Sequence, residues 1–210
     1  MKKLNVLAST AIAVVSLAAG CTVFAPRTDD TRYFILSPET VVVSASPLAP
    51  GDRLAVGIGP ITIPGYLDRP EVVTRTSATE LKVSNNERWG ERLRSNVATV
   101  LSQGLSSQLP GVDLMKFPWP LNSAPDYQVS VDFQRLELTG DGQTQVVATW
   151  IIRSTSDHRQ LQAGSTNVSA AAGKDEKSAS EALSHGVAQV SRDIAQALST
   201  QFESRKSAKP

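Results

Sequence analysis

The chain of 210 residues carries 21 lysines and arginines against 20 aspartates and glutamates, and 40% of its residues are hydrophobic. A formal net charge of +1 gives no electrostatic reason to expect nucleic acid as a partner. One cysteine excludes a disulfide framework and a multi-cysteine metal site, and two histidines leave little material for metal binding or acid–base catalysis.

The first 20 residues have the pattern of an export signal. Lys2 and Lys3 are followed by an apolar stretch at residues 6–19, which is too short to span a bilayer. Small residues then precede Cys21, and the run LAAGC resembles the bacterial lipoprotein lipobox, with its usual leucine one place early. We expect residues 1–20 to be removed and Cys21 to carry an N-acyl group and an S-diacylglycerol. No other cofactor is expected. The alternative is an uncleaved interfacial helix with a buried thiol.

Lipidation at Cys21 leads to an expectation about location. Several acyl chains on one residue give stable membrane anchoring. Thr22 stands where enterobacterial lipoproteins kept in the inner membrane have aspartate, so it favours the outer membrane, with the protein on the periplasmic face. Residues 21–30 are expected to form the lipidated N-terminus and a tether of about 35 Å at full extension.

Short strands and one helix are predicted for the first part of the folded domain. β-Forming residues predict strands over residues 31–36, 53–59, 71–75 and 80–84, with a loop over residues 37–52. A helix follows, capped by Asn85 or Asn86 and ended by Pro110-Gly111. Its apolar stripe repeats at steps of three and four residues and consists of Leu93, Val97, Val100, Leu101, Leu105 and Leu109. Residues 112–117 are predicted as a short strand.

A three-stranded antiparallel meander and a second helix are predicted for the remainder. Alternating residues from Tyr127, an Asp-Gly hairpin signal at residues 140–142 and a turn near His158 define the meander. Ser178-x-x-Glu181 predicts a capping box for the helix. The apolar stripe of that helix consists of Leu183, Val187, Val190, Ile194, Leu198 and Phe202.

These elements predict an α+β fold. It is a largely antiparallel sheet with a long meander or hairpin and two amphipathic helices packed on one face. We expect a single domain over residues 31–203, followed by a disordered tail over residues 204–210.

Few residues suggest catalysis. The sequence contains neither a Gly-x-Ser-x-Gly elbow nor a Walker loop, and His185 is expected to be solvated. Gly57 and Gly59 begin a dinucleotide fingerprint, but Pro60 follows them. We therefore predict no catalytic residue, no metal ligand and no enzymatic activity, with a hydrolase as the weakest alternative.

Three stretches carry a family resemblance. Residues 59–75 read GPITIPGYLDRPEVVTR, which resembles the signature of the PqiC-like ABC-transport auxiliary lipoproteins. In that family Gly-Pro-Val-x-Ile-Pro leads to Tyr-Leu-Asp-Arg-Pro, and Ile61 here replaces the commoner valine. Residues 87–93 (ERWGERL) are similar to the family's Arg-Trp-Ala-Glu-Pro-Leu helix start, with Gly90 and Arg92 as departures. Residues 126–129, leading to Trp150, resemble its long hairpin.

The resemblance implies a non-enzymatic periplasmic lipoprotein. It would work with an MCE-domain protein and the associated inner-membrane permease, moving lipids or other hydrophobic molecules between the two membranes. It would dock the conduit at the outer membrane and support membrane integrity, and a homo-oligomer is among the expected assemblies. A periplasmic binding module unrelated to MCE transport stays open, either an assembly factor or a binder of an apolar ligand between sheet and helices.

The signature also supplies candidate partner contacts, because rigid aromatic and arginine residues are favoured anchors in interfaces. These candidates are Tyr66, Leu67, Asp68, Arg69, Arg88 and Trp89. In the alternative interpretation, Tyr66 and Leu67 fold onto the core, Asp68 and Arg69 form a local turn pair, and Trp89 packs at the helix start.

Overall fold

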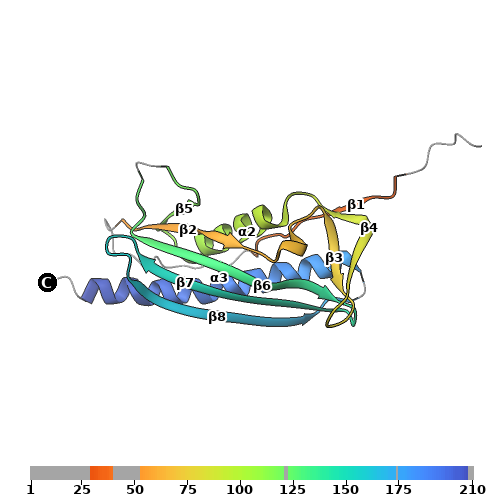
Figure 1. Cartoon of the computed structure of the whole chain (residues 1–210). Helices are drawn as coiled ribbons and strands as arrows, with labels where there is room; N and C mark the ends of the chain where they lie inside the picture. Colours follow the sequence, from red (N-terminus) through yellow and green to blue (C-terminus); the bar gives the residue numbers. More distant parts are fainter. Residues whose placement is uncertain (1–28, 40–52, 121–122, 174, 208–210) are drawn as a thin grey trace, which may run out of the picture. The chain divides into compact units, whose positions relative to one another are not determined.

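The computed structural model describes residues 29–39, 53–120, 123–173 and 175–207. The chain divides into Met1–Thr31 and Arg32–Pro210, and the described helices and strands lie in the second unit. In chain order these elements, labelled as in Figure 1, are β1 (Arg32–Phe34), β2 (Ala55–Thr62), the one-turn helix η2 (Gly65–Leu67), β3 (Glu71–Arg75), β4 (Leu81–Trp89), α2 (Leu93–Gln108), β5 (Asp113–Lys116), β6 (Tyr127–Thr139), β7 (Gln143–Ser154), β8 (Gln160–Ala171) and α3 (Glu176–Ser207). The predicted signal segment, Cys21 and most of the predicted tether lie outside the described residues.

One mixed sheet of eight strands organises the described part of the chain (Figure 1). Its central strand, β6, pairs along one edge with β7, while its other edge pairs with β2 near its start and with β3 near its end. β8 pairs with β7 alone, so β6, β7 and β8 form the predicted antiparallel meander. Most paired residues of the sheet are antiparallel. The predicted fold class is therefore confirmed.

The two helices cover the sheet with their apolar sides. Every residue of the two predicted apolar stripes is buried. The helices contact each other, and α3 also packs on β7 and β8. Gly186 lets α3 approach the sheet, because a Cβ at that position would collide with a Val146 methyl group of β7. The two stripes and the inward-facing residues of the strands together form the core.

The predicted start of the first helix is wrong. Asn85 and Asn86 belong to β4, and α2 begins only at Leu93, without a side-chain cap. The end of β4 stays extended because residues 87–89 pair in parallel with β1, which lies more than 50 residues earlier in the chain. A tertiary pairing therefore overrides the local capping signal.

The predicted ends of the last helix also differ from the structure. α3 begins at Glu176, and the side chain of Asp175 accepts hydrogen bonds from the backbone N–H and the hydroxyl of Ser178. Asp175 therefore caps this helix in place of Ser178. These hydrogen bonds hold the pKa of Asp175 below its usual value. At its other end α3 continues to Ser207, so it includes residues 204–207 of the predicted tail.

Candidate functional site

The signature run from Gly59 to Arg75 forms the end of β2, the turn η2 and the whole of β3. Two backbone hydrogen bonds close the turn, from Leu67 N–H to the Pro64 carbonyl and from Asp68 N–H to the Gly65 carbonyl. The Leu67 side chain is 2% exposed and belongs to the core. Burial of Leu67 therefore fixes the position of the turn on the domain.

A buried carboxylate holds the tyrosine of the signature in place. The Tyr66 hydroxyl donates to Glu137 Oε2 at 2.7 Å, and Arg75 Nε donates to Glu137 Oε1 at 2.6 Å. Arg135 Nε adds a third hydrogen bond at 3.0 Å, and the Arg75 guanidinium lies 5.5 Å from the centre of the Tyr66 ring. The Glu137 side chain is fully buried. We call these four residues the Glu137 cluster.

The electrostatics of the Glu137 cluster favour an ionised carboxylate. Burial alone would raise the pKa of Glu137, but the hydrogen bonds from its three donors outweigh burial and hold the pKa below its usual value. Burial, together with the hydrogen bond to this carboxylate, raises the pKa of Tyr66. The cluster is therefore a charge-assisted clamp between η2, β3 and β6.

Three arginines lie on the surface beside this clamp. Arg69 Nε and Arg88 Nη1 each lie 2.8 Å from a carboxylate oxygen of Glu71, and Arg94 Nη2 of α2 lies 2.6 Å from Asp68 Oδ2. Hydrogen bonds from Arg69 and Arg88 lower the pKa of Glu71 to about 2. The arginine side chains remain between 33% and 49% exposed, so each can still reach a partner. We call these three residues the arginine rim.

The structure divides the predicted contact residues into two groups. Leu67 and Trp89 are buried in the core, and the Trp89 backbone N–H donates to the Pro70 carbonyl. Tyr66 is partly buried in the Glu137 cluster. Asp68, Arg69 and Arg88 remain at the surface. In the alternative interpretation Asp68 and Arg69 form a local pair; in the structure Asp68 pairs with Arg94, and Arg69 pairs with Glu71.

Residues outside the candidate set complete the site. Arg94 and Glu137 were not predicted, because they come from α2 and β6 and reach the signature only through the fold. Glu137 lies between Leu136 and Leu138, which face the cores on the helix side. Strand alternation turns its side chain to the opposite face. The alternation of residues along β6 could have been read from the sequence. The contact between Glu137 and Tyr66 of η2 could not, because it depends on the fold.

The interior beneath the signature is closed. A cavity of about 10 Å³ lies among Leu67, Trp89, Leu136 and Leu183, enough for roughly one water molecule. It is too small for an acyl chain, so this cavity does not support a ligand held between sheet and helices. Within the described residues, no three His, Cys, Asp or Glu side chains are grouped to hold a metal ion. No helix in the described ranges is long and apolar enough to cross a membrane.

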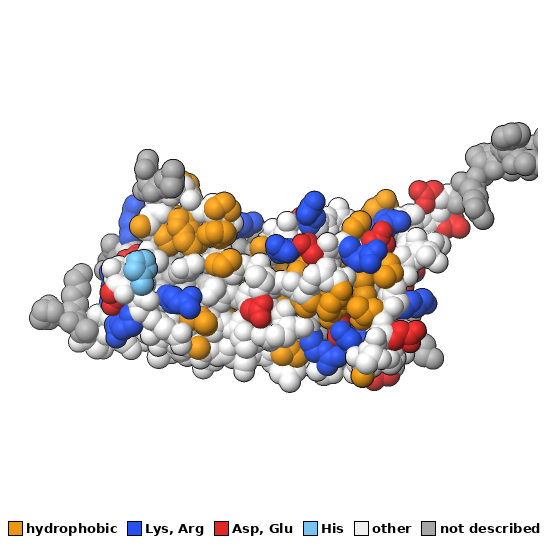
Figure 2. Space-filling view, in the orientation of Figure 1, with side chains coloured by type: hydrophobic (Ala, Val, Ile, Leu, Met, Phe, Trp, Pro, Cys, Tyr) orange, Lys and Arg blue, Asp and Glu red, His pale blue; other side chains and the backbone are white. Residues whose placement is uncertain are grey.

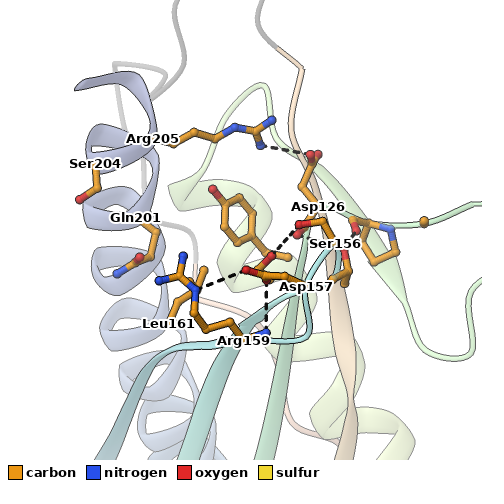
Figure 3. Close-up of a pocket in the computed structure, with 13 residues that line it drawn as sticks. Asp126, Ser156, Asp157, Arg159, Leu161, Gln201, Ser204 and Arg205 are labelled. Atoms are coloured by element: carbon orange, nitrogen blue, oxygen red, sulfur yellow. Dashed lines mark hydrogen bonds and ion pairs between the residues drawn. The ribbon is translucent and has the colours of Figure 1, made fainter. Parts of the chain in front are cut away.

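A larger hollow lies where β6 begins, β7 turns into β8 and α3 ends (Figure 3). Its volume is about 680 Å³, and we call it the distal pocket. Two ion pairs line it, Arg205–Asp126 at 3.1 Å and Arg159–Asp157 at 3.4 Å. The pocket therefore offers both signs of charge to a bound group. It was not predicted, because its residues come from the start of β6, the turn between β7 and β8, and the end of α3, which are distant in sequence.

The distal pocket and β1 lie at opposite ends of the domain. Arg32 of β1 contacts Glu176 at the start of α3, at 3.1 Å. Arg205 of the pocket is 29 residues further along the same helix, on the order of 40 Å away at the usual rise per residue. The arginine rim lies near the β1 end, because Arg88 of β4 pairs directly with Tyr33 of β1.

Comparison with known proteins yields relatives in both sequence and structure. The family model for the ABC-type transport auxiliary lipoprotein component matches residues 34–195. The intermembrane transport lipoprotein PqiC of Escherichia coli (strain K12) is 31% identical over 102 residues, which are 49% of this chain and 52% of that protein. The Shigella flexneri protein of the same name matches equally. The chain therefore spans about half the length of the curated relatives that it matches.

Two crystal structures share the fold. A protein from Xanthomonas campestris superposes with a TM-score of 0.67, covering 83% of this chain and 99% of that one, at 14% identity. A second, uncharacterised protein superposes with a TM-score of 0.65, covering 80% and 98%, at 22% identity. At these identities the similarity establishes the architecture alone.

Proposed function

Because the chain belongs to the ABC-type transport auxiliary lipoprotein family, we propose that it is the lipid-anchored periplasmic subunit of an MCE/ABC-type transport system. In this role it docks the conduit at the outer membrane, where lipids or other hydrophobic molecules pass between the membranes, and so supports membrane integrity. The observation that carries the proposal is the family match over residues 34–195. The domain acts through contact and not through catalysis.

The position of the arginine rim supports a docking role close to the membrane. Arg88 stands beside Tyr33 in the sheet, and Arg32 follows the proposed lipidated Cys21 by only eleven residues. A chain of that length reaches at most about 38 Å. A partner bound to the rim is therefore kept near the outer membrane that holds the anchor.

The rim has the chemistry of a protein contact. Its arginines are held in position by Glu71 and Asp68 but keep much of their side-chain surface free. Arginine is enriched among the residues that dominate binding energy at interfaces. On the face drawn in Figure 2, basic and acidic side chains lie beside hydrophobic ones.

The docking proposal predicts a specific loss of partner. From detergent-solubilised membranes, the tagged protein is expected to recover the MCE-domain protein. The double variant Arg69→Ala/Arg88→Ala is expected to recover on the order of tenfold less. Its unfolding temperature is expected to stay close to that of the wild type, because exposed ion pairs contribute little to stability.

The matched control removes two arginines from the distal pocket, as Arg159→Ala/Arg205→Ala, and should leave recovery unchanged. Full recovery with the rim variant would place the contact elsewhere on the domain. Failure of the wild-type protein to recover any MCE-domain protein would refute the transport role itself.

Copies of the chain are also proposed to associate through β8. This edge strand has twelve residues and contains neither a charged residue nor proline. Exposed edge strands are usually protected from pairing with another chain by a charged residue, by proline or by being short. The edge strands β1 and β5 have only three and four residues. β8 lacks these protective features, so its edge is suited to pairing with a strand of another molecule.

This association predicts a native mass that is a multiple of the chain mass. Lysines at two exposed positions of β8, as Ser165→Lys/Asn167→Lys, are expected to shift the protein to the monomer through like-charge repulsion at the paired edges. The control Ser165→Ala/Asn167→Ala should remain associated. A wild-type protein that is monomeric in native mass spectrometry would exclude this association.

A further inference from the structure

The β1 end of the domain exposes two large apolar side chains. Phe34 and Leu36 pack into the core, whereas Tyr33 and Ile35, which alternate with them along this extended stretch, point outward. Tyr33 is 66% exposed and Ile35 is 57% exposed, the two highest values among the large hydrophobic residues described as exposed. They border a shallow hollow of about 390 Å³ that is also lined by Glu39, Lys177 and Glu181. Lys177 Nζ lies 3.9 Å from Glu181 Oε1, and the Lys177 side chain is 79% exposed. We call Tyr33 and Ile35 the β1 patch.

This patch lies at the point where the chain enters the folded domain. Arg32, its neighbour, is the first residue of the unit Arg32–Pro210 and follows Cys21 by eleven residues. At full extension those residues reach about 38 Å, so an anchor at Cys21 keeps the patch within that distance of the lipid surface. The distal pocket, at the far end of α3, has no such constraint.

The side chains of the patch suit the membrane interface. Tyrosine places an apolar ring and a polar hydroxyl at the level of the headgroups, and isoleucine adds an apolar surface that loses contact with water there. Lysine near such a site can extend its amine towards phosphates. The covalent anchor keeps the β1 patch at a high local concentration of lipid. The patch can therefore contact the membrane even if the same contact is too weak to bind a protein without an anchor.

We propose that the β1 patch lies against the phospholipid surface of the membrane that carries the anchor and so orients the domain on it. This inference rests on the proposed lipidation of Cys21. Tyr33 and Ile35 then enter the headgroup region, and α3 carries the distal pocket away from the patch.

The single cysteine of the chain provides the test. Once Cys21 is lipidated, the variant Ile35→Cys has one free thiol, which can carry a polarity-sensitive fluorophore. The full-length lipidated protein is reconstituted into vesicles of phosphatidylethanolamine and phosphatidylglycerol. The control is Phe117→Cys, which replaces a residue of similar exposure (53%) in a different part of the sheet, after β5.

The label at position 35 is expected to shift to the blue, and nitroxide-bearing lipids are expected to quench it at least about twofold more than the label at position 117, as for a side chain that enters the interface. Equal quenching at both positions by a water-soluble quencher, with none by the lipid quencher, would overturn the proposal. A blue shift that depends on protein concentration and not on lipid would also overturn it, because a second copy would then cover the patch.

Failure of the anchor gives a different result. If Cys21 carries no lipid, the wild-type protein reacts with the thiol label and does not float with the vesicles, and the orientation proposal falls together with the anchor. If the wild-type protein floats and remains unlabelled while the label at position 35 stays in water, the anchor holds and only the orientation proposal is wrong.

Discussion

Replacing Glu137 with alanine is expected to destabilise the domain by about 3 kcal/mol, at the lower end of the cost of breaking a buried ion pair. The substitution leaves the Arg75 and Arg135 charges without their carboxylate and the Tyr66 hydroxyl without its acceptor. The lower end applies because Arg135 is 38% exposed and water can replace part of the lost interaction.

Urea unfolding at neutral pH measures this loss, and Glu71→Ala is the matched control. Glu71 is also held by two arginines but lies at the surface, so its removal should cost much less. The variant Glu137→Gln keeps the shape and one acceptor, and it should fall between the wild type and the alanine variant. Equal stabilities for Glu137→Ala and Glu71→Ala would show that the Glu137 cluster does not stabilise the signature turn.

The same carboxylate predicts sensitivity to acid. The pKa of Glu137 is lower in the folded domain than in the unfolded chain. Its contribution to stability is therefore complete above the pKa of the unfolded chain, about 4.3, and is lost as the pH falls through the lower folded value. The free energy of unfolding of the wild type, measured by urea unfolding at a series of pH values, should therefore decrease below about pH 4. In Glu137→Gln the part of this decrease that is due to Glu137 should be absent. If the free energy of unfolding decreased equally with pH in the wild type and in Glu137→Gln below about pH 4, the buried carboxylate would not be ionised in the folded domain.

Replacing Cys21 with serine is expected to release the protein from the membrane fraction. A single acyl chain binds a bilayer only marginally, whereas several chains on one residue hold it stably. Loss of all of them should move nearly all of the exported protein out of the membrane pellet. Fractionation after a high-salt wash measures the effect, because salt also weakens ionic contacts between the arginine rim and a membrane-bound partner.

The variant Thr22→Asp separates anchoring from sorting. It keeps the lipidated cysteine, so the protein should remain in the membrane, but it is expected to move from the outer to the inner membrane. Membrane attachment that persists in Cys21→Ser through the salt wash would refute the lipid anchor and favour the uncleaved interfacial helix.

Patterns that repeat within one element were read correctly from the sequence. The two helix stripes and the β6–β8 meander are present as predicted, because periodicity and turn residues are local properties of the chain. The signature predicted the family for the same reason, since its residues are contiguous. Both depend on residues close together in sequence.

Errors arose where a distant segment decided the local structure. Asn85 and Asn86 are good helix caps, but pairing of the end of β4 with β1 keeps this stretch extended. Arg69 is a good partner for Asp68 by proximity, but Arg94 of α2 reaches that carboxylate instead. In both cases a long-range contact outweighed a local preference of about 1 kcal/mol.

Composition already argued for contact over chemistry, because one cysteine and two histidines leave little material for catalysis. The order of the apolar residues was sufficient for the fold class, because that order determines which side of each helix and strand must be buried. Only the tertiary structure distinguished the residues of the signature. It placed Leu67 and Trp89 in the core and Tyr66 on a buried carboxylate, and it left Arg69 and Arg88 at the surface. The reason is that exposure depends on which distant strand or helix covers a residue, and the packing of α2 and β6 around the signature decides this.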